Sequence, residues 1–299
     1  MPTVSDLYKI EYNRLFSYYQ DKQLAFSVFK FLYEYTFEKK FFLVDNNAIF
    51  TKVKKQEFIT YVDQITILDM PFQYILKIVP FLDSEIEINP PVLIPRPETE
   101  WWVDYLTKKL REKKNKKLFI ADFCSGSGCI GIGLLKFFER GLCDSFDNTP
   151  QAVYLAAKNA QSNGVKSRYK VYLKDILTLK KHKKYDIIVS NPPYISLSDY
   201  EKLDNSVKLW EKKSALTDEK NGYTIILHIL MFVKKSLKKN SVLCIEICES
   251  YARFLLKYTK EIYPHDFVFL LEDQYNKKRV LIVAKGEYKK FFENIYETH

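Results

Sequence analysis

The sequence predicts an α/β protein in which a small helical bundle and a linker with a β-hairpin precede a seven-stranded, doubly wound, mostly parallel sheet. Residues 1–70 contain almost no glycine or proline, and their apolar positions recur at helical spacing. Residues 71–99 hold most of the prolines. Residues 100–299 alternate short apolar runs with loops and helical segments, which indicates a parallel sheet. We therefore expect three parts: 1–70, 71–99 and 100–299.

Composition indicates a soluble, globular protein. The chain has 299 residues, of which 47% are hydrophobic and 28% charged, so it can bury a core. No apolar run approaches the roughly 18 residues that cross a bilayer, and we expect no membrane partner. The first residues lack the basic and apolar segments of a secretory signal, and early acidic residues argue against a transit peptide.

Cysteine, histidine and lysine patterns narrow the function classes. The cysteines are odd in number and form no CxxC motif, so we expect reduced thiols and a cytoplasmic location. The net charge of +10 permits an RNA-rich partner such as the ribosome, but we favour a solvated, lysine-rich surface. The histidines are scattered without an i,i+4 pair, so we expect no metal site; they are His182, His228, His265 and His299.

Two apolar stripes define the expected bundle, and we interpret both as core. One stripe comprises Ala25, Phe29, Leu32, Tyr33 and Phe37. The other comprises Phe58, Tyr61, Val62 and Ile65.

The linker differs from its neighbours because its prolines exclude regular helix, so we expect an ordered linker with a short hairpin. Glu85–Asn89 alternates acidic and apolar residues, which indicates one strand of a short hairpin. Pro97 suits the first turn of a helix that has Trp102, Leu106 and Leu110 on one face.

From Lys117 onward, strands and helices alternate. We expect helices at Ile130–Phe138 and after Thr149, which is placed to cap a helix that starts at Pro150 and ends at Asn163-Gly164. The seven expected strands are Leu118–Phe123, Leu142–Asp147, Arg168–Leu173, Tyr185–Ser190, Val242–Ile247, Asp266–Leu271 and Arg279–Ala284.

A glycine-rich loop and two acids form a candidate nucleoside site. Gly126 and Gly128 allow a tight turn before a helix whose N-terminal amides attract a carboxylate. Asp147 ends the next strand, where it can accept both ribose hydroxyls of NAD or of S-adenosylmethionine, or serve only as a helix cap. Asp175 follows the third strand and can accept from an adenine amino group, or be an ordinary turn residue.

The most informative motif is Asn191-Pro192-Pro193-Tyr194, directly after an apolar strand. Two prolines fix the backbone, so that the Pro192 carbonyl faces outward as an acceptor. The Asn191 side-chain oxygen is a second acceptor, and Tyr194 can pack against a flat group. Two converging acceptors suit a planar –NH2 group, so the motif predicts a clamp for an amide or an aryl amine.

With these motifs, the chain resembles the HemK/PrmC family of release-factor glutamine N5-methyltransferases over roughly Pro71 to Gly286. The resemblance implies a Rossmann-like class I methyltransferase domain. The most specific match is the Pro-Arg-Pro-Glu-Thr-Glu stretch, where sister enzymes acting on a ribosomal-protein glutamine usually differ. The segments that match are Pro71-Phe-Gln-Tyr-Ile-Leu76, Val92-Leu-Ile-Pro-Arg-Pro-Glu-Thr-Glu100, the glycine loop, Asp147-Asn-Thr-Pro-Gln-Ala152 and Ser190-Asn-Pro-Pro-Tyr-Ile195.

The resemblance implies S-adenosylmethionine as cofactor and a release factor as protein substrate. It assigns the target glutamine to Asn191, Pro192, Pro193 and Tyr194, with Asn191, Pro192 and Tyr194 catalytic. The first 70 residues match only in helical character, and their substrate-docking role is assigned by position. Asp175 is added to the cofactor residues because it follows the third predicted strand. The cofactor residues that the resemblance implies are Cys124, Ser125, Gly126, Ser127, Gly128, Asp147 and Asn191, with Ile176 beside adenine.

The sequence departs from the family pattern in four places. Cys124, Lys77 and Cys248 stand where the family usually has glycine, and Trp210-Glu-Lys-Lys213 replaces a Phe-Glu-Pro-like segment. The glycine loop and the clamp remain, so we expect an effect on affinity and partner fit rather than loss of activity.

Two other function classes stay open. A nucleic-acid amino-methyltransferase uses a similar clamp on a flipped base, but the chain after Tyr194 has little room for a DNA-reading domain. A non-catalytic scaffold is the second, and the intact Asp147 and Asn191 argue against it. We expect a monomer with no stable nucleic-acid partner.

Overall fold

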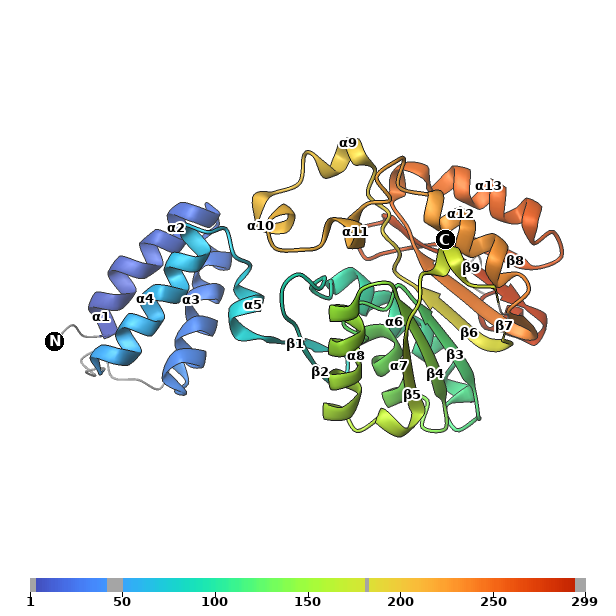
Figure 1. Cartoon of the computed structure of the whole chain (residues 1–299), viewed down its shortest axis with the longest axis horizontal. Coiled ribbons are helices and arrows are strands. Elements are labelled where there is room, and N and C mark those ends of the chain that lie inside the picture. The colour runs from blue at the N-terminus through green and yellow to red at the C-terminus, as the bar shows by residue number, and fades with distance from the viewer. Residues whose placement is uncertain (1–3, 42–50, 181–182, 294–299) are drawn as a thin grey trace. The chain divides into compact units, whose positions relative to one another are not determined.

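A computed structural model of the chain describes residues 4–41, 51–180 and 183–293. Contacts within it define two compact units, each described here by itself (Figure 1). The first is Met1–Ile78 with Asp204–Trp210, and the second is Val79–Leu203 with Glu211–His299. The functional division expected at positions 70 and 99 stays a prediction. None of the helices in the described ranges is long and apolar enough to span a bilayer.

The first unit is helical, as the sequence predicts. Asp21 caps the helix that begins at Lys22 by accepting from the backbone N–H groups of Gln23 and Leu24, and Thr51 caps the helix that begins at Lys52 by accepting from Lys54 N. The helices are α1 (Val4–Leu7), α2 (Asn13–Tyr19), α3 (Lys22–Phe37), α4 (Lys52–Thr66), α5 (Phe72–Leu76) and α10 (Asn205–Lys208), with a π-helical turn at Tyr8–Tyr12.

The two predicted apolar stripes form the core of this unit. All their members are buried except Tyr61, which is half-buried and donates its hydroxyl hydrogen to Glu57. A distant segment joins the unit through Trp210, whose indole Nε1 donates to the carbonyl oxygen of Leu68 at 2.9 Å. The bundle is therefore completed by residues far along the chain.

Helix α5 corrects the prediction that the linker contains no regular helix. Its five residues fit between Pro71 at the N-cap and Pro80 beyond its end, so neither ring enters the helix. The predicted hairpin is present as β1 (Ile78–Phe81) and β2 (Ser84–Glu87). The Asn159 side chain accepts from Glu87 N at 2.8 Å and donates to Glu87 O at 2.9 Å, which fixes the hairpin against α8 (Pro150–Ser162).

The second unit contains the predicted seven-stranded sheet in the order β5-β4-β3-β6-β7-β9-β8. All pairs are parallel except those of β9, which runs antiparallel to both neighbours. The strands are β3 (Phe119–Phe123), β4 (Leu142–Asp147), β5 (Tyr169–Leu173), β6 (Tyr185–Ser190), β7 (Leu237–Glu246), β8 (Phe267–Glu272) and β9 (Lys278–Lys285). The helices are α6 (Pro97–Lys109), α7 (Cys129–Phe137), α8 (Pro150–Ser162), α9 (Leu197–Tyr200), α11 (Lys213–Leu216), α12 (Thr224–Val233) and α13 (Ala252–Ile262).

Most predicted boundaries hold to within one residue, but β7 begins at Leu237 rather than at Val242. Its first residues include Lys238, Lys239 and Asn240. Because these side chains are polar, this part of the strand does not form the apolar run by which the other strands were predicted. The predicted face of α6 is confirmed, because Trp102, Leu106 and Leu110 are buried.

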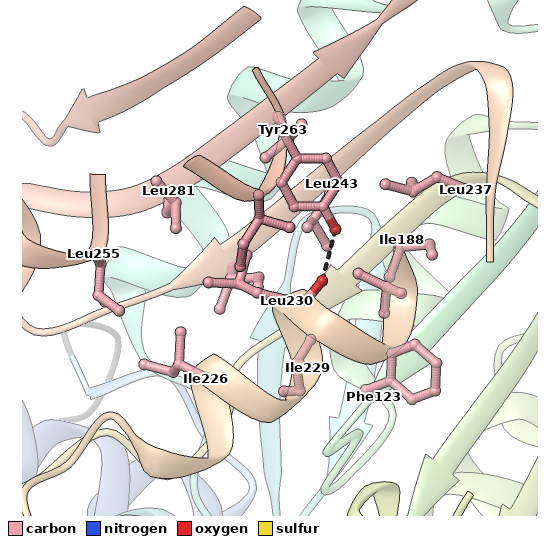
Figure 2. Packing of buried hydrophobic residues seen from close by; sticks show 14 of the residues in the cluster. Phe123, Ile188, Ile226, Ile229, Leu230, Leu237, Leu243, Leu255, Tyr263 and Leu281 are labelled. Carbon is pink, nitrogen blue, oxygen red and sulfur yellow. Dashed lines mark hydrogen bonds between the residues drawn. The ribbon is translucent and has the colours of Figure 1, made fainter. Parts of the chain in front are cut away.

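Helices cover both faces of the sheet. Alternate residues of a strand point to opposite faces, so Ala121 and Phe123 pack with α12 and α13 while Asp122 reaches the first turn of α7. Figure 2 shows the α12–α13 side of this core, where the hydroxyl of Tyr263 donates to the carbonyl oxygen of Leu230 at 2.7 Å. The chain leaves β3 toward β4 on one side and returns as β6 on the other. Ligands bind at such a reversal, outside the carboxyl ends of the strands.

Lys77 offers a test of backbone strain. It ends α5 with φ at +64°, a left-handed conformation that costs about 1–2 kcal/mol for a residue with a Cβ. Glycine, usual here in the resembling family, removes this cost but loses about 0.5–1 kcal/mol of chain entropy. We expect Lys77→Gly to raise the free energy of unfolding by about 0.5–1 kcal/mol in denaturant titrations. Lys77→Ala is the matched control and should give no gain; equal stability of both variants would contradict the account.

Candidate active site

The ends of four strands bring the predicted site residues together. Phe123, the last residue of β3, pairs with Phe146 of β4 and with Ser190 of β6. Ser190 in turn pairs with Ile245 of β7. The residues that follow these pairs therefore meet at one edge of the sheet: Cys124, Asp147, Asn191 and Glu246.

A cavity lies at this edge, and it encloses about 780 Å³ of empty space when its open mouth is included. Predicted site residues that line it are Cys124, Gly126, Asp147, Asp175, Ile176, Asn191 and Pro193. Ser125, Ser127, Gly128, Pro192 and Tyr194 are not among its lining residues.

The glycine loop is held to the end of β4 by its own backbone. Gly126 N donates to Asp147 Oδ2 at 2.9 Å, and Ser125 N donates to the Phe146 carbonyl at 3.1 Å. Gly126 has φ at +54°, and a Cβ there would enter open space. The loop therefore presents bare backbone to the cavity. The Ser125 hydroxyl is buried and has no hydrogen-bond partner within residues 4–41, 51–180 and 183–293.

The two inner residues of the loop support it from behind. Gly128 has φ at +83°, and a Cβ there would lie 2.7 Å from the Tyr169 hydroxyl, so only glycine fits. The Ser127 carbonyl accepts from Asn159 Nδ2 at 2.9 Å. Both residues are buried, which makes their contribution one of loop shape.

Cys124 is a strained entry to the loop. Its φ is +59°, in the left-handed region where the resembling family's usual glycine carries no steric cost. Burial raises the pKa of its thiol well above the usual range, so the thiol stays protonated. Cys248, the other cysteine at a usual glycine position, has an ordinary φ of −80°. All five cysteines are free.

Asp147 uses its carboxylate to organise the backbone on both sides. Besides Gly126, it accepts from Thr149 N at 2.9 Å through Oδ1. The expected capping of α8 by the Thr149 side chain is wrong, because its hydroxyl donates to Asn148 Oδ1 instead. Burial raises the pKa of Asp147, although the two backbone donors oppose the shift.

The far wall of the cavity combines one acid with apolar side chains. Asp175 accepts from Leu177 N at 2.9 Å through Oδ1 and begins the 3-10 turn Ile176–Thr178. Ile176 is buried, and Phe146 and Ala152 face the same cavity. Such a wall suits a flat, apolar ring with a polar edge.

The Asn191–Tyr194 motif is anchored to a buried acid that sequence reasoning missed. Asn191 Nδ2 donates to Thr99 Oγ1 at 3.1 Å, and the Thr99 hydroxyl donates to Glu246 Oε2 at 2.7 Å. Trp102 Nε1 donates to the same oxygen at 2.7 Å. The Tyr194 hydroxyl donates to Glu246 Oε1 at 3.0 Å. Glu246 thus holds both ends of the motif.

Glu246 is 1% exposed, and this burial raises the pKa of its carboxyl group, while the three hydrogen-bond donors oppose the shift. An acid at the carboxyl end of a predicted strand was the available signal. Its partners lie far away in the sequence, so their contact could not be read from spacing.

The backbone of the motif is fixed from the other side by Gly222 and Tyr251. Gly222 has φ at +83°, and a Cβ there would lie 2.5 Å from the Tyr194 carbonyl oxygen. The Tyr251 hydroxyl lies within hydrogen-bond distance of the carbonyls of Tyr194 and Gly222. Close backbone packing therefore restricts movement of Tyr194.

The Pro-Arg-Pro-Glu-Thr-Glu stretch is also tied to the segment that departs from the family pattern. Arg96 Nη2 lies 2.7 Å from both carboxylate oxygens of Glu211. Burial raises the pKa of Glu211, and the Arg96 charge opposes this. The neighbouring Lys212 lines the cavity and donates to Thr149 Oγ1 at 3.4 Å. Because Lys212 follows Glu211 in the chain, the ion pair of Glu211 with Arg96 helps to place the Lys212 ammonium group near Asp147.

No group of three or more His, Cys, Asp or Glu side chains that could hold a metal occurs in the described ranges. His182 and His299 lie outside those ranges. His228 lies 3.1 Å, by Nε2, from the Ile176 carbonyl oxygen.

The chain is similar in sequence and fold to known methyltransferases. Residues 102–215 match the family model described as "Methyltransferase small domain". The chain is 32% identical to a release factor glutamine methyltransferase of Lactococcus lactis, over 79% of this chain and 86% of the relative. It is 30% identical to one of Clostridium acetobutylicum, over 77% and 79%. A solved methyltransferase structure from Pyrococcus furiosus shares the fold, with a TM-score of 0.50, 17% identity, and coverage of 72% of this chain and 94% of that one.

Asp122 behind the glycine loop predicts a dependence of stability on pH. Its Oδ2 accepts from Gly131 N, and Oδ1 has no partner among the described residues. Burial raises the pKa of Asp122 to about 8, above its value of about 4 in the unfolded chain. The fold therefore favours the protonated acid, and stability falls as pH rises from about 4 to about 8.

The slope due to Asp122 is at most about 1.4 kcal/mol per pH unit. Asp122→Asn cannot titrate, so we expect the free energy of unfolding of the wild type to fall relative to the variant between about pH 5 and about pH 8. Denaturant titrations at several pH values measure this difference. Parallel pH profiles would contradict the burial argument.

Proposed function

The chain is a methyltransferase that belongs to the family of release factor glutamine methyltransferases, and on that premise we propose its substrate, cofactor and site roles. It transfers a methyl group from S-adenosylmethionine to N5, the side-chain amide nitrogen, of the glutamine in the Gly-Gly-Gln loop of a peptide-chain release factor. The observation that carries this proposal is that Asp147 and Asn191 line one cavity. A carboxylate that can bind a nucleoside and a side-chain oxygen that can bind an amide therefore face the same cavity.

The cofactor half of the cavity suits an adenosyl group. The Asp147 carboxylate accepts from the ribose hydroxyls, as acids at this position of doubly wound sheets do. Ile176 packs against the adenine ring, and Asp175 accepts from its amino group. The backbone of the loop from Cys124 to Gly128 holds the amino-acid end, where the buried Ser125 hydroxyl is a further polar partner.

The other half of the cavity receives the target amide. The Asn191 side-chain oxygen and the Pro192 carbonyl accept the two hydrogens of the –NH2 group, and Pro193 and Tyr194 shape the cleft around it. A carboxylate would place oxygens against both acceptors and be repelled. Glycines beside the target glutamine let an extended loop enter without side-chain clashes.

Positioning accounts for the chemistry. When bound, S-adenosylmethionine supplies an electrophilic methyl group on its sulfonium. An amide nitrogen is a weak nucleophile because its lone pair is delocalised, so the clamp must hold it in line and favour a pyramidal nitrogen. Such positioning can supply on the order of 7–11 kcal/mol. A strong base before attack is not required, since the nitrogen becomes far more acidic once it is methylated.

Residues 1–70 dock the release factor, because the second unit has little chain to spare for recognition of a protein. The nucleic-acid alternative requires a reading domain, and the chain after Tyr194 is occupied by three strands and their helices. A monomer in the cytoplasm without a stable nucleic-acid partner stays a prediction.

The cofactor assignment is tested at Asp147. Replacing Asp147 by Ala should weaken binding of S-adenosylmethionine by about 1.5–3 kcal/mol, the range for hydrogen bonds to a charged group. Isothermal titration calorimetry measures it. Asp144 lies earlier on the same strand and bonds to Lys183 and Tyr185, so Asp144→Ala is the control and should keep the affinity. Unchanged affinity of Asp147→Ala would refute the ribose assignment.

The clamp is tested at Asn191 and on the substrate. Asn191→Ala should lower kcat for release factor by about 10²–10³-fold, the cost of removing one preorganised polar group from a reaction centre. In the release factor, Gln→Glu should abolish transfer. Gln→Asn should lower the rate of methyl transfer about 10²-fold, because the shorter side chain leaves its amide nitrogen about 1.5 Å short of the methyl group. Near wild-type turnover of Asn191→Ala, measured with radiolabelled cofactor, would defeat the clamp.

A further inference from the structure

The Asn191 carboxamide has two ends of opposite character, and only one of them can serve the proposed clamp. Its oxygen accepts hydrogen bonds, whereas its nitrogen donates them. A rotation by half a turn exchanges the two ends without changing the shape of the side chain. What faces the amide substrate is therefore decided by the group that binds the other end, which is the Thr99 hydroxyl at 3.1 Å.

The direction of these bonds follows from Trp102. An indole N–H only donates, so Glu246 Oε2, at 2.7 Å from it, must be an acceptor. The Thr99 hydroxyl shares that oxygen at 2.7 Å and has a single hydrogen, which it gives to the carboxylate. Thr99 Oγ1 is left with lone pairs only. It can therefore only accept from Asn191, and Asn191 must offer it Nδ2.

We propose that Thr99, oriented by Glu246 and Trp102, sets the rotational state of the Asn191 carboxamide so that Oδ1 points into the cavity. Thr99 and Glu246 are positioning residues, and through Asn191 they make the site select an amide over a carboxylate. The inference rests on the proposed function for its substrate. The orientation itself rests only on the bonds among the four side chains.

The same carboxylate fixes the opposite end of the motif, because Glu246 Oε1 accepts from the Tyr194 hydroxyl. All four groups are buried or half-buried: Thr99, Trp102 and Glu246 are each 1% exposed. Water is thereby kept from competing for the Thr99 oxygen. A side chain without a hydroxyl at position 99 would leave the carboxamide free to present its nitrogen to the substrate.

The test replaces Thr99 by Val, which keeps the shape and removes the hydroxyl. With cofactor saturating, we expect kcat for release factor to fall by about 10- to 100-fold, as for other small errors in positioning. The Kd for S-adenosylmethionine should stay within about 2-fold, since Thr99 does not line the cavity. Thr99→Ser keeps the hydroxyl and should recover most of the activity.

A second readout separates orientation from a general structural role. The Gln→Glu release factor should inhibit the wild type weakly. In Thr99→Val, the affinity for the Gln→Glu protein relative to the Gln protein should be about 10-fold higher than in the wild type. The reason is that a rotated Asn191 carboxamide would offer Nδ2 as a donor to the Glu carboxylate. Thr107→Val is the matched control, since Thr107 is a buried threonine on the same helix whose hydroxyl donates to the Asp104 carbonyl. It should change neither kcat nor the Gln-to-Glu preference.

The outcomes are distinguishable. If wild-type protein does not methylate the glutamine, the proposed function fails, and the orientation is then judged by NMR of the Asn191 side-chain NH2 signals. These should exchange slowly with solvent in the wild type and faster in Thr99→Val. The inference is overturned if Thr99→Val keeps wild-type kcat and preference, if Thr99→Ser is as impaired as Thr99→Val, or if the NH2 exchange is unchanged.

Discussion

The buried carboxylate of Glu246 is the constraint on which the rest of the site depends. Burying a charge costs several kcal/mol unless hydrogen bonds replace its water. Here three donors from two distant segments supply them: Thr99 and Trp102 from α6, and Tyr194 from the loop after β6. Removal of any donor leaves the buried carboxylate with one hydrogen bond fewer. The three bonds therefore hold α6 and the loop after β6 against the end of β7, which carries Glu246. These bonds connect the Pro-Arg-Pro-Glu-Thr-Glu stretch to the Asn191–Tyr194 motif.

The strand register supplies the second constraint. The last residues of β3 and β6 pair with each other, with Phe146 of β4 and with Ile245 of β7, so the chain segments that follow these pairs start at the same edge. Asp147 then accepts from backbone groups on both sides, which leaves the loop fixed while its glycine backbone faces the cavity. A site of this kind is preorganised, since its acceptors are held by the fold before any ligand arrives.

Local patterns in the sequence predicted the strands, the glycine loop, Asp147 and the clamp, because each rests on neighbouring residues. Contacts over long separations could not be predicted. Glu246 is the last residue but one of a predicted strand, yet nothing local marks its bonds to Thr99 and Trp102. The same holds for Trp210, which joins the first unit through the Leu68 carbonyl. Helix α5 was missed because proline signals outweighed five residues that fit between them.

The central claim is that the paired acceptors select the amide of a peptide glutamine. Its most direct test is to incubate the protein with S-adenosylmethionine and a mixture of release factor, ribosomal proteins and DNA, and to locate the transferred methyl group by tandem mass spectrometry. The account predicts methylation at N5 of the glutamine in the Gly-Gly-Gln loop of the release factor. A methyl group on adenine, on a ribosomal protein alone, or elsewhere on the release factor would contradict it.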